Sequence, residues 1–128
     1  MFRKVGLFCM GALLATQVFA APQYIGAGRE INYDLEPNVV ISLINKTFLD
    51  VRGTCHITTE EPSAIIHVHM IQSHAEIDGE LLDAKDNKDK DLYVQNGSAF
   101  YIHMPPTAGA DLVNKGQKTM KVHCVAAG

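Results

Sequence analysis

Two cysteines constrain the fold of this chain more than any other feature. Cys55 lies in residues 51–57 and Cys124 in residues 120–124, and in both stretches apolar and polar residues alternate. Such alternation is typical of a strand with one buried face. Both cysteines fall on the apolar phase, so they are expected to point into the core. The sequence therefore predicts a domain of strands built around a Cys55–Cys124 disulfide.

The first twenty residues have the layout of a secretory signal peptide. Two basic residues precede an apolar run at 5–14, and Val18-Phe19-Ala20 places small side chains at the −3 and −1 positions of a cleavage site. The apolar run is shorter than the ~20 residues that a membrane-spanning helix needs, so no transmembrane segment is expected. A buried N-terminal helix is the alternative. We expect cleavage between Ala20 and Ala21, which leaves a single β domain at residues 21–128.

Cys9 belongs to this leader. A lipidation box is not expected there, because the bulky Phe8 stands where a small side chain is needed. Cys55 and Cys124 then remain in the exported chain, 69 positions apart. Exported proteins meet oxidising compartments, where such a pair forms a structural disulfide. A thiol metal site or redox pair is the alternative, but the sequence has no C-x-x-C motif.

The net charge excludes one class of partner. The leader holds two of the eleven basic residues and none of the fourteen acidic ones, so the remaining 108 residues carry a formal net charge of −5. The chain has no basic stripe, and binding to a nucleic-acid backbone is not expected. Protonation of all six histidines on acidification would bring the net charge to +1. This shift is expected to favour contact with anionic membranes or glycans.

Short strands separated by turn residues make up the chain after the leader. Turn signals recur roughly every 8–12 residues, a spacing typical of an antiparallel β-sandwich or a small barrel. We expect an all-β domain of seven or eight strands with immunoglobulin-like architecture, although the chain has no tryptophan and lacks the Cys…Trp…Cys pattern of antibody domains. The expected strand segments are 31–35, 39–44, 48–59, 65–71, 75–82, 92–95, 98–104 and a last strand that includes 120–124.

Local composition also predicts the connections. Asp78-Gly79 and Asn96-Gly97 are two-residue turn sequences that favour β-hairpins. Residues 83–91 are almost all charged or amide, so a solvated loop is expected. Residues 107–116 are interpreted as a longer connection, with a short helical turn at 110–114.

Six histidines are the most unusual feature of the composition. On the expected strand phasing, five of them point away from the core: His56, His67, His69, His103 and His123. His67 and His69 lie on one side of a strand with backbones about 7 Å apart. They are candidate metal ligands, and His56 or His123 would complete a Cu or Zn site of three or four ligands. The favoured interpretation is nevertheless that all are ordinary polar residues on half-exposed strands and that no cofactor is bound, with the metal site as the alternative.

Other chemistry finds little support in the sequence. The loop at 83–91 carries three lysines and lacks the ligand order and closing glutamate of a calcium-binding EF-hand. No G-x-S-x-G motif occurs. No neighbouring residue marks a nucleophile at any of the serines considered: Ser42, Ser63, Ser73 and Ser98. An enzyme is therefore not expected.

Three features of the chain resemble small exported proteins of Gram-negative bacteria, including host-associated species. These features are the leader that ends Val18-Phe19-Ala20-Ala21-Pro22, the opening strand at 31–35 and the single late cysteine pair. The resemblance implies a periplasmic or secreted location and an interaction role. It carries over no site residue.

The expected function is that of a non-enzymatic binding module in the bacterial envelope or at a host surface. Its partner would be a protein, a glycan or an envelope component. A periplasmic Cu- or Zn-binding protein is the alternative. A small hydrolase or its inhibitor is a third hypothesis, which no particular residue supports. Three imidazole nitrogens converging on one point would favour metal, whereas scattered histidines beside an apolar patch would favour a partner surface.

Overall fold

A computed structural model describes residues 18–127. Cys9 and most of the predicted leader lie outside these residues. The described chain forms twelve strands and one short 3₁₀-helix: β1 (Val18–Phe19), β2 (Gln23–Ile25), β3 (Glu30–Leu35), β4 (Val39–Asn45), β5 (Val51–Thr58), β6 (Ala64–Gln72), β7 (His74–Ile77), β8 (Glu80–Asp83), η1 (Ala84–Asp86), β9 (Lys90–Val94), β10 (Ala99–Met104), β11 (Gly109–Asn114) and β12 (Met120–Ala126). The all-β fold class is confirmed.

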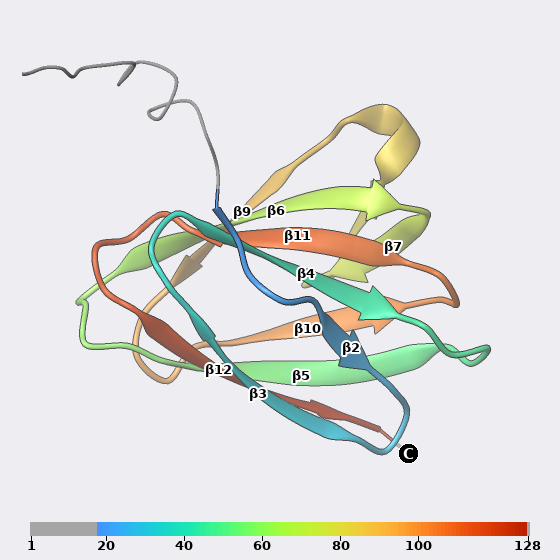
Figure 1. The fold of residues 1–128 in the computed structure, drawn as a ribbon, viewed down its shortest axis with the longest axis horizontal. Coiled ribbons are helices and arrows are strands. Elements are labelled where there is room, and N and C mark those ends of the chain that lie inside the picture. The colour runs from blue at the N-terminus through green and yellow to red at the C-terminus, as the bar shows by residue number, and fades with distance from the viewer. Residues whose placement is uncertain (1–17, 128) are drawn as a thin grey trace, which may run out of the picture.

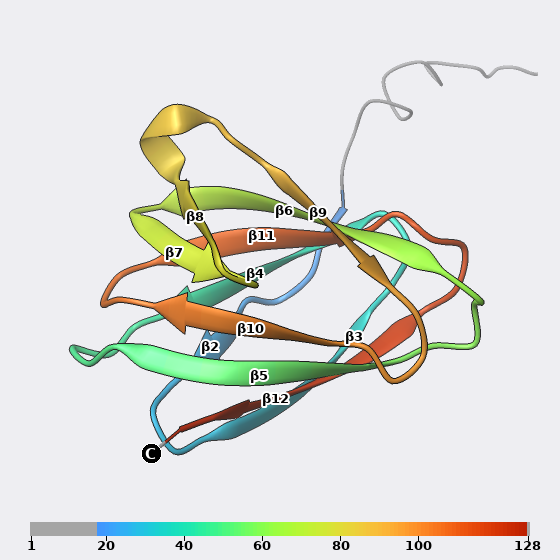
Figure 2. The same cartoon turned by 180° about the vertical axis from the view of Figure 1, so that it is seen from behind.

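Two six-stranded sheets pack face to face as a sandwich (Figure 1, Figure 2). Sheet A has the order β1-β4-β11-β6-β9, and β2 also pairs with β4. Sheet B has the order β3-β12-β5-β10-β7-β8. Neighbouring strands are antiparallel except for β1 and β2, which both run parallel to β4. The sandwich therefore has more strands than the seven or eight expected, because short strands such as β1 and β2 carry no alternation to reveal them.

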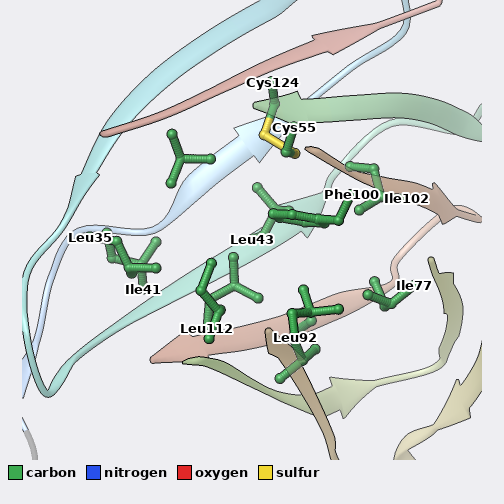
Figure 3. Packing of buried hydrophobic residues seen from close by; sticks show 14 of the residues in the cluster. Leu35, Ile41, Leu43, Cys55, Ile77, Leu92, Phe100, Ile102, Leu112 and Cys124 are labelled. Carbon is green, nitrogen blue, oxygen red and sulfur yellow. A yellow bond between two sulfur atoms is a disulfide. The ribbon is translucent and has the colours of Figure 1, made fainter. Parts of the chain in front are cut away.

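The core lies between the sheets and follows the predicted alternation. On β6, Ile66, Val68 and Met70 are buried, whereas His67 and His69 between them are partly exposed. The same phasing holds on β5 and β12. Figure 3 shows side chains of both sheets meeting in this layer. Each large apolar side chain that is fully buried there contributes about 1.5–3 kcal/mol by its removal from water.

The predicted disulfide is confirmed and lies within sheet B. Cys55 of β5 and Cys124 of β12 are bonded, with an S–S distance of 2.07 Å. The two residues are direct partners in the antiparallel register. The bond therefore joins neighbouring strands at the core face of one sheet and does not link the two sheets (Figure 3).

The expected helical turn at 110–114 is wrong. These residues belong to β11, which lies between β4 and β6 in sheet A. Glycine, alanine and aspartate at 109–111 have low strand propensity. Pairing with β4 on one side and β6 on the other, together with burial of Leu112, outweighs this low propensity. Gly109 also suits close packing, since a Cβ there would lie 3.4 Å from Ile71 Cγ1.

One of the two predicted hairpins is also wrong. Asp78-Gly79 joins β7 to β8 as expected. Asn96-Gly97 does form a tight turn, in which Ser98 N donates to Gln95 O at 2.9 Å. However, β9 pairs with β6 in sheet A, and β10 pairs with β5 and β7 in sheet B. The turn therefore carries the chain from one sheet to the other, because turn chemistry fixes a local reversal but not the pairing of the two flanking strands.

The last residues of the predicted leader form part of sheet A. Val18 and Phe19 pair with Val39 and Val40 of β4, and Pro22, which has no N–H to donate, separates β1 from β2. Cleavage after Ala20 stays a prediction. No helix within residues 18–127 has the length and apolar character needed to cross a membrane.

Candidate functional site

A compact group of titratable side chains lies on the outer face of sheet A. His67 and His69 project from β6, Asp91 pairs directly with His67 from β9, and Asp89 precedes β9. Three close contacts join them: His67 Nδ1 to Asp91 Oδ1 at 2.6 Å, His67 Nε2 to Asp89 Oδ2 at 2.8 Å, and His69 Nδ1 to Asp89 Oδ1 at 2.7 Å. The Asp89 carboxylate thus bridges the two rings. We call these four residues the His–Asp cluster.

Carboxylates face both ring nitrogens of His67, which favours the charged form of the ring. A neutral imidazole carries one N–H and can donate to only one of them. The hydrogen bond with Asp91 raises the pKa of His67 above its ordinary value of 6.5, partial burial lowers it, and the contact with Asp89 raises it again, with a net upward shift. Partial burial raises the pKa of Asp89, but hydrogen bonds with His69 and His67 outweigh it and the net shift is downward.

The four histidines named as metal ligands do not come together. His56 and His123 face each other across β5 and β12 on the outer face of sheet B. His67 and His69 lie on the outer face of sheet A, on the other side of the sandwich. The expectation that His56 or His123 completes a site with His67 is therefore wrong, because the strands belong to different sheets. No group of three or more His, Cys, Asp or Glu side chains among residues 18–127 is arranged to hold a metal ion.

The outer face of sheet B carries a second candidate site. Tyr101 of β10 and Val125 of β12 both pair with Thr54 of β5, so the three form one row across the sheet. Arg52 pairs with His103 in the adjacent row. The Tyr101 and Val125 side chains are 63% and 41% exposed. A shallow depression of about 850 Å³ runs over these rows. We call six of the residues that line it the β5 face: Arg52, Thr54, His56, Tyr101, His103 and Val125.

Acidic side chains lie beside the outer histidines of sheet B. His103 Nε2 lies 3.3 Å from Asp50 Oδ2, and its Nδ1 lies 4.0 Å from Glu76 Oε2. His123 Nε2 lies 3.4 Å from Glu30 Oε2, next to the β5 face. The surface therefore combines an exposed aromatic ring, a guanidinium and imidazoles with acids around them. Such a mixture suits contact with a polar partner surface.

Three of the four serines considered above make side-chain contacts: Ser42, Ser73 and Ser98. Ser42 Oγ donates to Asp111 Oδ1 at 2.5 Å, so its partner is an acid and not the imidazole base that activates a nucleophile. Ser98 Oγ accepts from Gln95 N at 2.9 Å. Ser73 Oγ lies 3.4 Å from Nδ1 of the neighbouring His74, a long contact between adjacent side chains at the surface. These contacts add no support for a hydrolase.

Sequence reasoning did not connect Asp89 and Asp91 with the histidines, and it did not single out Tyr101 or Arg52. The spacing of Asp89 and Asp91, two residues apart around the start of β9, could have indicated that both carboxylates lie on one side of a strand. No protein-family model matches this chain, and neither a curated protein nor a solved structure matches it. These comparisons therefore assign no role to the residues of either site.

Proposed function

We propose that this protein is an exported, non-enzymatic binding module whose β5 face contacts a partner. The observation that carries the proposal is the exposed row of Tyr101 and Val125 next to Arg52 over a shallow depression. Tyrosine and arginine are the residues that most often dominate binding energy at interfaces. An open depression suits a broad surface better than a small molecule, which proteins usually enclose in a deeper pocket.

The expected location and the scaffold support the same role. A disulfide-clamped sandwich holds the β5 face on three neighbouring strands, β12, β5 and β10, so partner binding costs little ordering of the backbone. The partners consistent with periplasmic or secreted placement are a protein, a glycan or an envelope component.

A photo-crosslinking side chain at position 101 tests this proposal in the producing cell. Tyr93, which is 79% exposed on the edge strand β9 of the other sheet, is the matched control position. We expect a discrete crosslinked adduct from position 101, no such adduct from position 93, and loss of the adduct on Arg52→Ala. The proposal fails if position 101 gives no adduct, or if both positions give the same adducts.

The His–Asp cluster favours a second candidate function, the binding of Cu(II) or Zn(II) by His67 and His69. The supporting observation is that Asp89 contacts both rings, so a turn of its carboxylate would free two imidazoles and an oxygen ligand close together. We expect micromolar affinity at best. Calorimetry of His67→Ala/His69→Ala should then show no saturable heat, whereas the control His56→Ala/His123→Ala should bind like the parent protein. Binding that is absent in the parent, or unchanged in the first variant, contradicts this candidate.

A further inference from the structure

The edge of β4 is covered by the last residues of the predicted leader. Val18 pairs with Val39 and Phe19 with Val40, and Ala20 N donates to Val40 O at 2.9 Å. Farther along the same edge, β2 pairs with residues 43–45 of β4. Figure 1 shows this segment running along β4 on the side that faces the viewer. The side chains of Val18 and Phe19 are 59% and 64% exposed, so backbone pairing is their main contact.

Cleavage between Ala20 and Ala21 would remove β1 and leave β2 in place. Residues 39–41 of β4 would then have an unpaired edge with no charged side chain. A depression of about 700 Å³ lies beside this edge. Ala20 and Ile41 line it from sheet A, and Tyr33 and Val122 line it from sheet B. Asp34 and Lys121 also line it, so the exported chain would present an open strand edge next to a depression with both apolar and charged side chains.

The other strands at the sheet edges carry features that protect against pairing with foreign strands. On β3, Glu30 and Asp34 are exposed charges. On β9, Lys90 lies on the same side of the strand as the buried Leu92 and contacts Glu80. This edge strand therefore carries a charge on its inward side. The edge strand β8 has only four residues and carries the charges of Glu80 and Asp83. Charges on edges and short edge strands are common devices against unwanted strand addition. Among the described edges, residues 39–41 would be the exception.

We propose that removal of residues 1–20 opens the edge of β4 at residues 39–41 as a docking site for an extended, uncharged apolar segment of a partner protein, which pairs parallel to β4. The residues that occupy this edge in the structure indicate the chemistry of the partner segment, because Val18-Phe19-Ala20 is extended, apolar and parallel to β4. Addition of a strand to an open sheet edge is a common mode of peptide recognition. A second copy of the chain fits less well, because its own free edges on β3 and β9 carry charges. The proposal rests on the predicted cleavage and not on the β5 face.

The test uses the protein purified from its host. Intact mass must first show an N-terminus at Ala21, and retention of residues 1–20 overturns the proposal because the edge stays covered. A labelled, amidated peptide of residues 15–20 is then the probe, and fluorescence anisotropy measures its binding. Two further peptides carry a single N-methyl group, one on the Ala20 nitrogen and one on the Phe19 nitrogen. Backbone groups alternate along a strand, so the Ala20 N–H points to β4 and the Phe19 N–H points away.

We expect saturable binding of the parent peptide and of the Phe19 N-methyl peptide. The Ala20 N-methyl peptide should bind more weakly by about fivefold or more, the effect of one lost hydrogen bond. Absence of saturable binding overturns the proposal, as does an equal loss for both N-methyl peptides, which would indicate non-specific apolar contact. A stable dimer that the parent peptide dissociates would assign the edge to a second copy instead. None of these outcomes depends on crosslinking from position 101, so the two proposals fail separately.

Discussion

Cys55 and Cys124 are direct partners across β5 and β12, with Cα atoms 4.0 Å apart. The bond fixes the register of two neighbouring strands near the middle of sheet B. A one-residue slip would turn every side chain of a strand to the opposite face, so register decides which residues enter the core. The same register sets His56 opposite His123 on the outer face.

Loss of this disulfide should destabilise the fold. The bond closes a loop between residues 69 positions apart, and we expect Cys55→Ser/Cys124→Ser to lower the free energy of unfolding by roughly 2–5 kcal/mol. Denaturant unfolding measures the change, and the parent protein unfolded under reducing conditions is the control that should match the variant. An unchanged midpoint would contradict the prediction, as would titration of two free thiols in the native protein.

The pH dependence of His67 should reflect its contacts with Asp91 and Asp89. Its pKa in the folded state lies above 6.5, so the stabilising contact is complete below pH 6.5 and is lost as the pH rises through the folded pKa. We expect Asp91→Asn to lower the pKa of His67 in an NMR titration. Because the ring is about one third exposed, the variant should lose no more than about 1 kcal/mol near pH 5.5 and less near pH 8.

The matched control for this titration is Asp50→Asn. Asp50 contacts His103 on the other sheet, so its replacement should leave the pKa of His67 unchanged. An equal response of His67 to both variants would show that overall charge sets its pKa, and not the contact with Asp91.

Glu80 should titrate well below other exposed carboxyls. Lys88 Nζ lies 2.8 Å from its Oε2 and Lys90 Nζ lies 2.9 Å from its Oε1, and these contacts lower the pKa of Glu80 from 4.5 to about 2. The stabilising contribution is therefore present above pH 4.5 and is lost as the pH falls towards 2. Lys88→Met should raise the pKa in a carboxyl-carbon NMR titration, whereas Lys85→Met on the same loop should not. A pKa near 4.5 in the parent protein would refute this ion-pair network.

Asn114 of sheet A should be sensitive to substitution. Its buried amide donates to Leu35 O at 2.9 Å and to Lys118 O at 2.8 Å, and its Oδ1 accepts from Gly116 N at 2.7 Å. Asn114→Ala removes all three bonds and should lower the free energy of unfolding by about 3 kcal/mol, because buried partners lose their hydrogen bonds. The exposed control Gln117→Ala should stay within about 0.5 kcal/mol of the parent protein. Similar stabilities of the two variants would contradict this role for Asn114.

The candidate sites show where sequence reasoning stops. The outward phase of His67 and His69 could be predicted, since period-two alternation is a local property of the chain. Their pairing with Asp89 and Asp91 could not, because it depends on β9 adding to β6 at a particular register. The sequence also could not predict that His67 and His123 lie on different sheets. Alternation indicates which side of a strand a residue occupies, but not which sheet the strand joins.

The sequence by itself determined the all-β class, the core face of β5, β6 and β12 and the pairing of Cys55 with Cys124. These features come from hydrophobic alternation and from having two cysteines after the predicted leader, which are properties of single segments. Only the tertiary structure decided that residues 109–114 form an inner strand and that Asn96-Gly97 crosses between sheets. A strand acquires its partners from distant segments, and the burial gained by the whole sandwich outweighs the weak preferences of a few residues for turn or helix.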